Sequence, residues 1–112
     1  MSHQIITSEL LHEDPDLIDL VDRFVSRLPD MQSVIIKAFD EKDWENFVHL
    51  IHQMKGVAGN YGYPMLTNLC ADMELKVKAE SFLEVADKLK EFKVMIEAIL
   101  AGRNGNHEIV KR

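Results

Sequence analysis

The sequence predicts an all-α fold, an antiparallel four-helix bundle preceded by a short N-terminal extension. Apolar residues recur at helical spacing in four successive stretches of the chain. Glycine and proline are scarce inside these stretches, and nothing between them signals a β-hairpin. Four amphipathic helices joined by short connections cannot bury their apolar stripes singly, so a bundle is the most economical packing. The 112 residues, 46% of them hydrophobic, are enough for one domain with its own core.

The first helix is predicted to begin near Asp16 and to run to about residue 39. Pro29 should kink or break this helix, because proline lacks an amide hydrogen and its ring clashes with the preceding turn. The apolar stripe nevertheless continues at Met31 and Ile35 with little phase error. We therefore expect one bent helix or two nearly collinear ones. Before the proline, the stripe comprises Leu17, Leu20, Val21, Phe24, Val25 and Leu28.

The second helix is predicted over residues 43–61, with Asp43 as a suitable N-cap. Gly62 follows as a flexible stop. Pro64 then suits the first turn of a third helix over residues 64–79, because an amide hydrogen has no helical partner there. These two helices would form a hairpin.

The fourth helix is predicted to open with a capping box at Ser81 and to end at Gly102. Its apolar stripe comprises Phe82, Val85, Ala86, Leu89, Phe92, Ile96 and Ile99. The polar segment that follows is expected to be mobile. The chain is thus divided into an N-terminal extension (1–13), the bundle (14–101) and a mobile tail (102–112).

Composition argues against several classes of protein. The net charge of -6 disfavours nucleic-acid binding, which needs a basic surface. No apolar run approaches the roughly 20 residues that span a bilayer, and the N-terminus does not resemble a secretory signal. The single cysteine, Cys70, falls in the apolar stripe of the third helix and is interpreted as a small buried hydrophobe, which fits a reducing cytoplasm. Acidic residues are concentrated in residues 1–30, where they could steer a basic partner or simply form a soluble face.

The second helix carries a histidine on its polar side. With successive residues about 100° apart and His52 set at zero, Lys55, Gly56 and Gly59 fall within about 60° of the histidine. The apolar residues of this helix fall on the opposite side: Phe47, Leu50, Ile51, Met54, Val57, Ala58 and Tyr61. The imidazole should therefore point into solvent, beside a cation and over a surface with little bulk.

An exposed histidine in this setting is suited to phosphoryl transfer. A neutral imidazole is a nucleophile near physiological pH. Transfer also requires compensation of charge on the phosphoryl oxygens, which Lys55 can supply from one turn after His52. Gly56 removes a side chain that would block approach. No glycine-rich phosphate loop accompanies these residues, so most of the catalysis would have to come from a second protein.

Residues 52–62, His-Gln-Met-Lys-Gly-Val-Ala-Gly-Asn-Tyr-Gly, resemble the motif of histidine phosphotransfer (HPt) domains, H-x-L-K-G followed by small residues and a late glycine. Residues 69–74, Leu-Cys-Ala-Asp-Met-Glu, resemble the C-x-x-L-E stretch that this family carries on its next helix. The resemblance covers about residues 14–100, and Phe24, Leu28-Pro29 and Asp43 also fit its pattern. Two departures are mild. Met54 replaces leucine with a similar volume, and Val57 stands where serine or alanine is frequent.

The resemblance implies a phosphorelay intermediate that carries phosphate and is not itself an enzyme. His52 would accept a phosphoryl group from the aspartate of one response-regulator receiver domain and pass it to another. Lys55 matches the family's lysine beside the phosphate, and Gly56 matches the glycine that permits docking. The docking surface would comprise Val48, His49, Gln53, Gly56 and Gly59, together with the exposed part of the third helix.

The same resemblance implies that the chain holds no metal or other cofactor, since Mg²⁺ would belong to the receiver. A receiver of a hybrid sensor kinase is one candidate partner. We expect a free-standing cytoplasmic monomer that binds neither nucleic acid nor membrane.

Other interpretations compete with this one. His49 and His52 could share a metal ion, but the glutamate of H-E-x-x-H is missing and no third ligand is evident. A helical adaptor could bind and inhibit a receiver or a kinase without carrying phosphate. A dimerisation fragment of a histidine kinase would need an ATP-binding domain and a symmetric dimer. Gly56 and Gly59 each cost about 1 kcal/mol in a helix relative to alanine, which either partner approach or tight packing of a neighbouring helix could offset.

Overall fold

The computed structural model describes the backbone of residues 6–111 and the side chains of residues 6–102. Within this part of the chain every regular element is helical, which confirms the predicted all-α class. The elements are α1 (Glu9–Glu13), the 3₁₀ turn η1 (Pro15–Leu17), α2 (Ile18–Asp40), α3 (Trp44–Asn60), α4 (Pro64–Lys78) and α5 (Phe82–Lys111). The two short elements, α1 and η1, were not predicted, and α1 lies inside the expected N-terminal extension.

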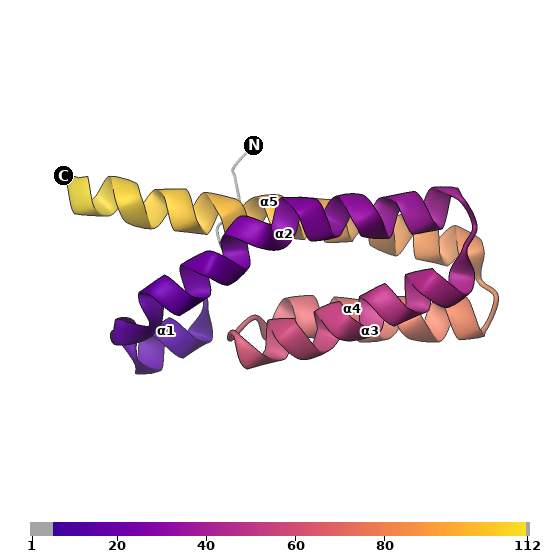
Figure 1. Ribbon diagram of the computed structural model, residues 1–112, viewed down its shortest axis with the longest axis horizontal. Coiled ribbons are helices and arrows are strands. Elements are labelled where there is room, and N and C mark those ends of the chain that lie inside the picture. Colours follow the sequence, from indigo (N-terminus) through magenta and orange to yellow (C-terminus); the bar gives the residue numbers. More distant parts are fainter. Residues whose placement is uncertain (1–5, 112) are drawn as a thin grey trace.

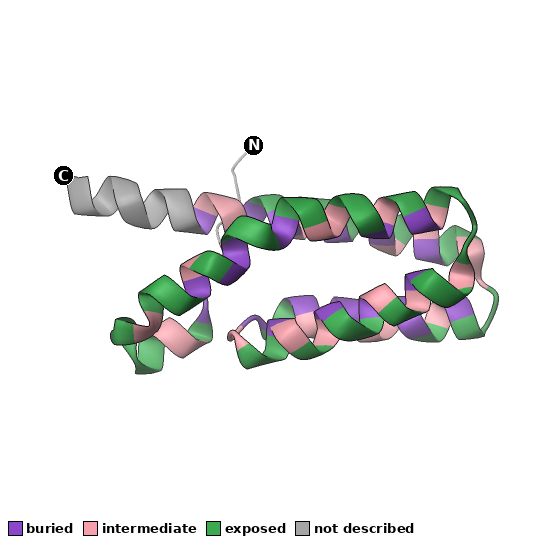
Figure 2. Ribbon diagram, in the orientation of Figure 1, coloured by how far each residue is buried: buried purple, intermediate pink, exposed green. Residues whose placement is uncertain are grey.

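The four long helices pack around one core. Contacts join α2 to α3, α3 to α4, α4 to α5 and α5 back to α2, and the α3–α4 pair is the most extensive. Figure 1 shows that the chain reverses direction after α2, after α3 and after α4. Buried residues occupy the sides of the helices that face one another (Figure 2). The largest fully buried side chains include Phe24, Phe47, Phe92, Leu28 and Ile35.

Helix α2 contains Pro29 at its midpoint and is continuous, as the uninterrupted apolar stripe predicts. Figure 1 shows the helix changing direction part-way along, which is the bend expected where proline removes a backbone hydrogen bond. The buried stripe of α2 is narrower than predicted, because Leu20 is 42% exposed. Val21 and Phe24 are buried as predicted, and the Phe24 ring stacks on Tyr61 with ring centroids 4.8 Å apart.

The starts of the two middle helices agree with the sequence signals. The Asp43 carboxylate accepts a hydrogen bond from the Asn46 amide at 3.4 Å, as an N-cap should. Pro64 is the first residue of α4. Gly62, between the two helices, has a φ of 85°, a conformation that glycine adopts without steric penalty.

The predicted end of the last helix at Gly102 is wrong, since α5 continues to Lys111. A glycine inside a helix costs about 1 kcal/mol relative to alanine but does not forbid helix, and the segment that follows contains no proline to stop it. The predicted mobility of residues 102–112 falls almost wholly on residues whose side chains are not described.

The N-terminal extension is bonded to the turn between α3 and α4. The Ser8 hydroxyl donates to the carbonyl of Tyr61 at 2.5 Å, and the Glu9 amide donates to the carbonyl of Gly62 at 2.8 Å. Ser8 also accepts from the Leu10 amide at 3.1 Å, so it caps α1 while holding the turn. Ser8 is only 1% exposed. Residues 8–10 therefore cover the end of the helix that carries His52.

Candidate functional site

Helix α3 turns its histidine outward. The four residues Phe47, Ile51, Met54 and Ala58 are fully buried, and they fix the rotation of the helix about its axis. On the other side, the His52 side chain is 65% exposed. The orientation predicted from helical spacing is therefore present in the structure, with the imidazole accessible to a second macromolecule.

A buried glutamate of the next helix joins the histidine to the lysine. Glu74 of α4 places Oε2 3.2 Å from Nδ1 of His52, and its Oε1 accepts a hydrogen bond from Nζ of Lys55 at 2.9 Å. Its side chain is only 9% exposed. A third basic side chain, that of Lys78, lies with Nζ 3.9 Å from Oε2. One carboxylate thus contacts three basic side chains.

Glu74 was quoted in the resemblance but was not predicted to belong to the site. It lies on the buried side of α4, between Met73 and Val77, because α4 packs along α3 and brings position 74 level with position 52. The Thr67 hydroxyl strengthens this register by donating to the carbonyl of Lys55 at 3.2 Å. A signal was available in the sequence, since an acidic residue inside an apolar stripe is rarely buried without a partner.

The surroundings of Glu74 keep its carboxylate ionised. The hydrogen bond from Lys55 lowers the pKa of Glu74 most strongly, burial acts in the opposite direction, and the charge of Lys55 and the contact with His52 lower it further. An ionised carboxylate can only accept hydrogen bonds. In the neutral ring, the nitrogen that faces it, Nδ1, therefore carries the hydrogen, which leaves the free lone pair on Nε2.

The two glycines beside His52 differ in their surroundings. A Cβ built on Gly56 would meet nothing within 4 Å, so packing inside this protein does not require a glycine there. At Gly59, a Cβ would lie 3.4 Å from Oγ1 of Thr67, which is ordinary contact with α4. Of the other residues predicted to form the docking surface, His49 and Gln53 are exposed and Val48 is half-buried.

The family model for the Hpt domain matches residues 19–102. The chain belongs to the Hpt family. Members of this family are helical phosphocarriers that act in histidine phosphotransfer relays and typically interact with receiver domains of response regulators. Comparisons with curated proteins and with solved structures gave no match.

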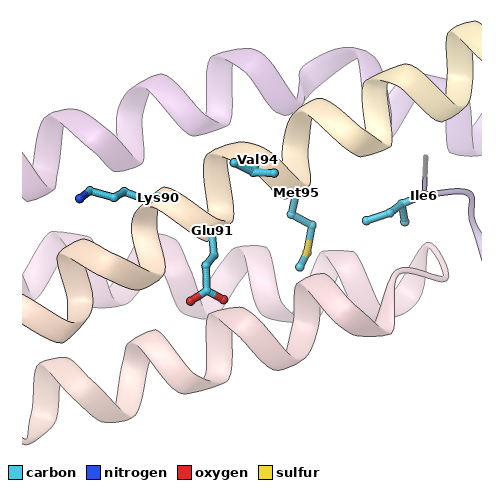
Figure 3. A pocket seen from close by; sticks show the side chains of 5 residues that line it. All are labelled: Ile6, Lys90, Glu91, Val94 and Met95. Carbon is cyan, nitrogen blue, oxygen red and sulfur yellow. The ribbon is translucent and has the colours of Figure 1, made fainter. Parts of the chain in front are cut away.

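Other features of this Hpt domain lie apart from the histidine. A shallow pocket of about 360 Å³ is lined by Lys90, Glu91, Val94 and Met95 of α5 and by Ile6 of the N-terminal segment, which lies beyond Met95 (Figure 3). None of these residues belongs to α3 or α4. Within the described part of the chain, no group of three His, Cys, Asp or Glu side chains is placed to hold a metal ion. None of the described helices has the length and apolar character needed to cross a membrane.

Cys70 of the Hpt domain is fully buried, as the apolar pattern predicted. Burial, with a smaller effect from the charge of Glu74, raises the pKa of the Cys70 thiol to about 12. The thiol therefore stays protonated near neutral pH, which disfavours a nucleophilic role.

The Hpt domain should lose part of its stability in acid through Glu74. Since the folded-state pKa of Glu74 lies below its unfolded value of about 4.3, the carboxylate stabilises the fold above that value. This contribution is lost as the pH falls through the lowered folded-state pKa. The measurement is urea unfolding of wild type and Glu74→Gln from about pH 6 downward. The free energy of unfolding should fall more steeply with decreasing pH in the wild type, and parallel curves would contradict this role of Glu74.

Proposed function

We propose that this protein is a phosphorelay intermediate in which His52 accepts a phosphoryl group from a receiver-domain aspartate and passes it to a second receiver. The observation that carries the proposal is the pairing of an exposed imidazole with a buried, ionised carboxylate. Nδ1 of His52 is held 3.2 Å from Oε2 of Glu74, while the side chain remains 65% exposed. This leaves Nε2 as the nucleophilic atom.

The transfer step follows from this arrangement. The lone pair of Nε2 attacks phosphorus, a P–N bond forms, and the P–O bond to the partner's aspartate breaks, so that the aspartate leaves as a carboxylate. The ring keeps its hydrogen on Nδ1 and becomes positively charged. Glu74 stabilises that charge at close range and holds the ring in one tautomer and orientation. Glu74 is thus a positioning residue, and the return transfer reverses each step.

Lys55 is placed to act on the phosphoryl group. It follows His52 by three residues on α3, so the two side chains lie on one face of the helix. In the unphosphorylated protein, Nζ of Lys55 donates to Oε1 of Glu74 at 2.9 Å, and the side chain is 30% exposed. A rotation of this side chain would bring the ammonium to the oxygens of a phosphoryl group on Nε2.

Gly56 supports docking of a receiver close to His52. The substitution Gly56→Leu should raise the free energy of unfolding by about 0.5–1 kcal/mol, because leucine favours helix more than glycine and no neighbour obstructs the new Cβ. The same substitution should weaken receiver binding by roughly tenfold or more, since the side chain projects beside His52. Urea unfolding and calorimetric titration with a receiver measure the two effects. Unchanged receiver affinity would show that Gly56 has no part in docking.

The proposal is tested by incubating the chain with a receiver domain carrying ³²P on its aspartate, in the presence of Mg²⁺. Label should move to this chain and should be acid-labile and alkali-stable, as phosphohistidine is. Its position at residue 52 is read by mass spectrometry of the intact phosphopeptide. A chain that binds the receiver without ever taking up label would instead be an inhibitory adaptor.

A further inference from the structure

Lys78 shares a carboxylate oxygen with His52. It lies at the C-terminal end of α4, one turn after Glu74, with Nζ 3.9 Å from Oε2 of that glutamate. The same Oε2 lies 3.2 Å from Nδ1 of His52. The distance between Nζ of Lys78 and Nδ1 of His52 therefore cannot exceed the sum of these two distances. A phosphoryl group on the ring would lie within reach of the flexible lysine stem.

Among the basic residues around Glu74, Lys78 is the one most easily released. Its side chain is 64% exposed and its contact with the carboxylate is long. Lys55 is 30% exposed and held to the same carboxylate at 2.9 Å. The other lysine of α4, Lys76, pairs with α5 and not with Glu74. Its Nζ lies 2.9 Å from Oε1 of Glu84.

The charges around His52 change when it is phosphorylated. A phosphoryl group brings up to two negative charges to the ring. The carboxylate of Glu74, which contacts Nδ1, adds a third negative charge nearby. Lys55 already donates to Oε1 of Glu74 at 2.9 Å, so part of its hydrogen-bonding capacity is used by the buried carboxylate when the phosphoryl group arrives. Release of Lys78 from Oε2 requires the smallest rearrangement, because its contact is the weakest of the three.

We propose that Lys78 is a second phosphate-binding residue, which leaves Glu74 and pairs with the phosphoryl oxygens when His52 is phosphorylated. Lys55 is then shared between Glu74 and the phosphoryl oxygens, and Lys78 adds a second ammonium to those oxygens. This inference rests on the proposed function, because it requires a phosphoryl group on His52. In the unphosphorylated protein, Lys78 makes only an exposed pair with Glu74 and a favourable contact with the α4 dipole.

The first test needs no partner protein. Phosphoramidate transfers its phosphoryl group to the Nε2 of histidine and releases ammonia, and ³¹P NMR then records the resonance of that group on the full chain near neutral pH, where the group is a dianion and the P–N bond is stable. Pairing with an ammonium changes the shielding of the phosphorus, so Lys78→Gln should shift this resonance from its wild-type position and Lys78→Arg should bring most of it back. Lys76→Gln is the matched control, since it removes a lysine from the same helix end without touching the site. Identical resonances of Lys78→Gln and wild type would overturn the inference.

The second test uses a phosphorylated receiver. Lys78→Gln should reduce the maximal transfer rate roughly tenfold, as expected for loss of one charge-assisted contact to the transferred group. Lys78→Arg should recover most of that rate, and Lys76→Gln should match the wild type. A change confined to the half-saturating receiver concentration would mean that Lys78 only assists docking, and would refute a role at the phosphate. Absence of label on wild-type His52 would defeat the proposed function itself, whereas normal labelling with an inert Lys78 defeats this inference alone.

Discussion

The substitution His52→Gln is expected to abolish phosphoryl uptake, to below one part in about 10³ of the wild-type rate, because glutamine offers no nucleophilic nitrogen. The fold should be unaffected, since the His52 side chain is 65% exposed and the core side of α3 is untouched. The measurement is transfer of ³²P from a receiver, with circular dichroism and thermal unfolding to confirm a native structure.

His49→Gln provides the matched control for this experiment. It removes an exposed histidine one turn earlier on the same helix, and no described contact of the site involves His49. The His49 variant should still take up label at saturating receiver, and because His49 belongs to the predicted docking surface, any change should be confined to the half-saturating receiver concentration. Label that persists in His52→Gln would show that another residue is the acceptor, and label lost in both variants would point to a general effect on this surface of α3.

The parts of the structure predicted from the sequence are those that depend on one helix at a time. Helical spacing alone fixed which side of α3 faces solvent, and it correctly placed His52 outside and Met54 inside. The same reasoning predicted that the helical pattern continues past Pro29, and α2 does so. These predictions need only the rotation of successive residues about an axis, which does not depend on neighbouring elements.

The features that the sequence did not predict depend on contacts between segments distant in the chain. The contact of Glu74 with His52 requires the register of α4 against α3, and helical spacing on either helix contains no information about it. The attachment of Ser8 to the turn at Tyr61 likewise joins the first residues of the chain to its middle. The error at Gly102 is of a different kind, because a local stop signal was treated as sufficient when glycine only weakens a helix.

The glycines of the motif serve different physical purposes, although the sequence presents them as one run of small residues. Gly56 has open space around it, Gly59 contacts Thr67 of α4, and Gly62 is enclosed by the N-terminal extension. Of these three glycines, only Gly62 has a positive φ. Substitution should therefore affect receiver docking at Gly56 and folding at Gly62.

The substitution Gly62→Ala is expected to lower the free energy of unfolding by about 2–4 kcal/mol. Part of this loss is the left-handed conformation, with a φ of 85°, which costs an L-residue about 1–2 kcal/mol. The remainder is overlap, because the new Cβ would lie 2.4 Å from the amide nitrogen of Leu10 and 2.5 Å from Oγ of Ser8. A backbone atom cannot rotate away as a side chain can, so α1 must shift and weaken its hydrogen bonds to the turn. Urea unfolding measures the loss, and the melting temperature should fall by roughly 8 °C or more.

Gly56→Ala separates this effect from the general consequence of replacing a glycine. Both substitutions add one methyl group, but at Gly56 the backbone is helical and the added Cβ meets nothing within 4 Å. That variant should be about 1 kcal/mol more stable than the wild type. The two variants should therefore change stability in opposite directions. If Gly62→Ala proved as stable as the wild type, residues 8–10 could not be packed against the turn as described, and the end of α3 would lack the support that the N-terminal extension gives it.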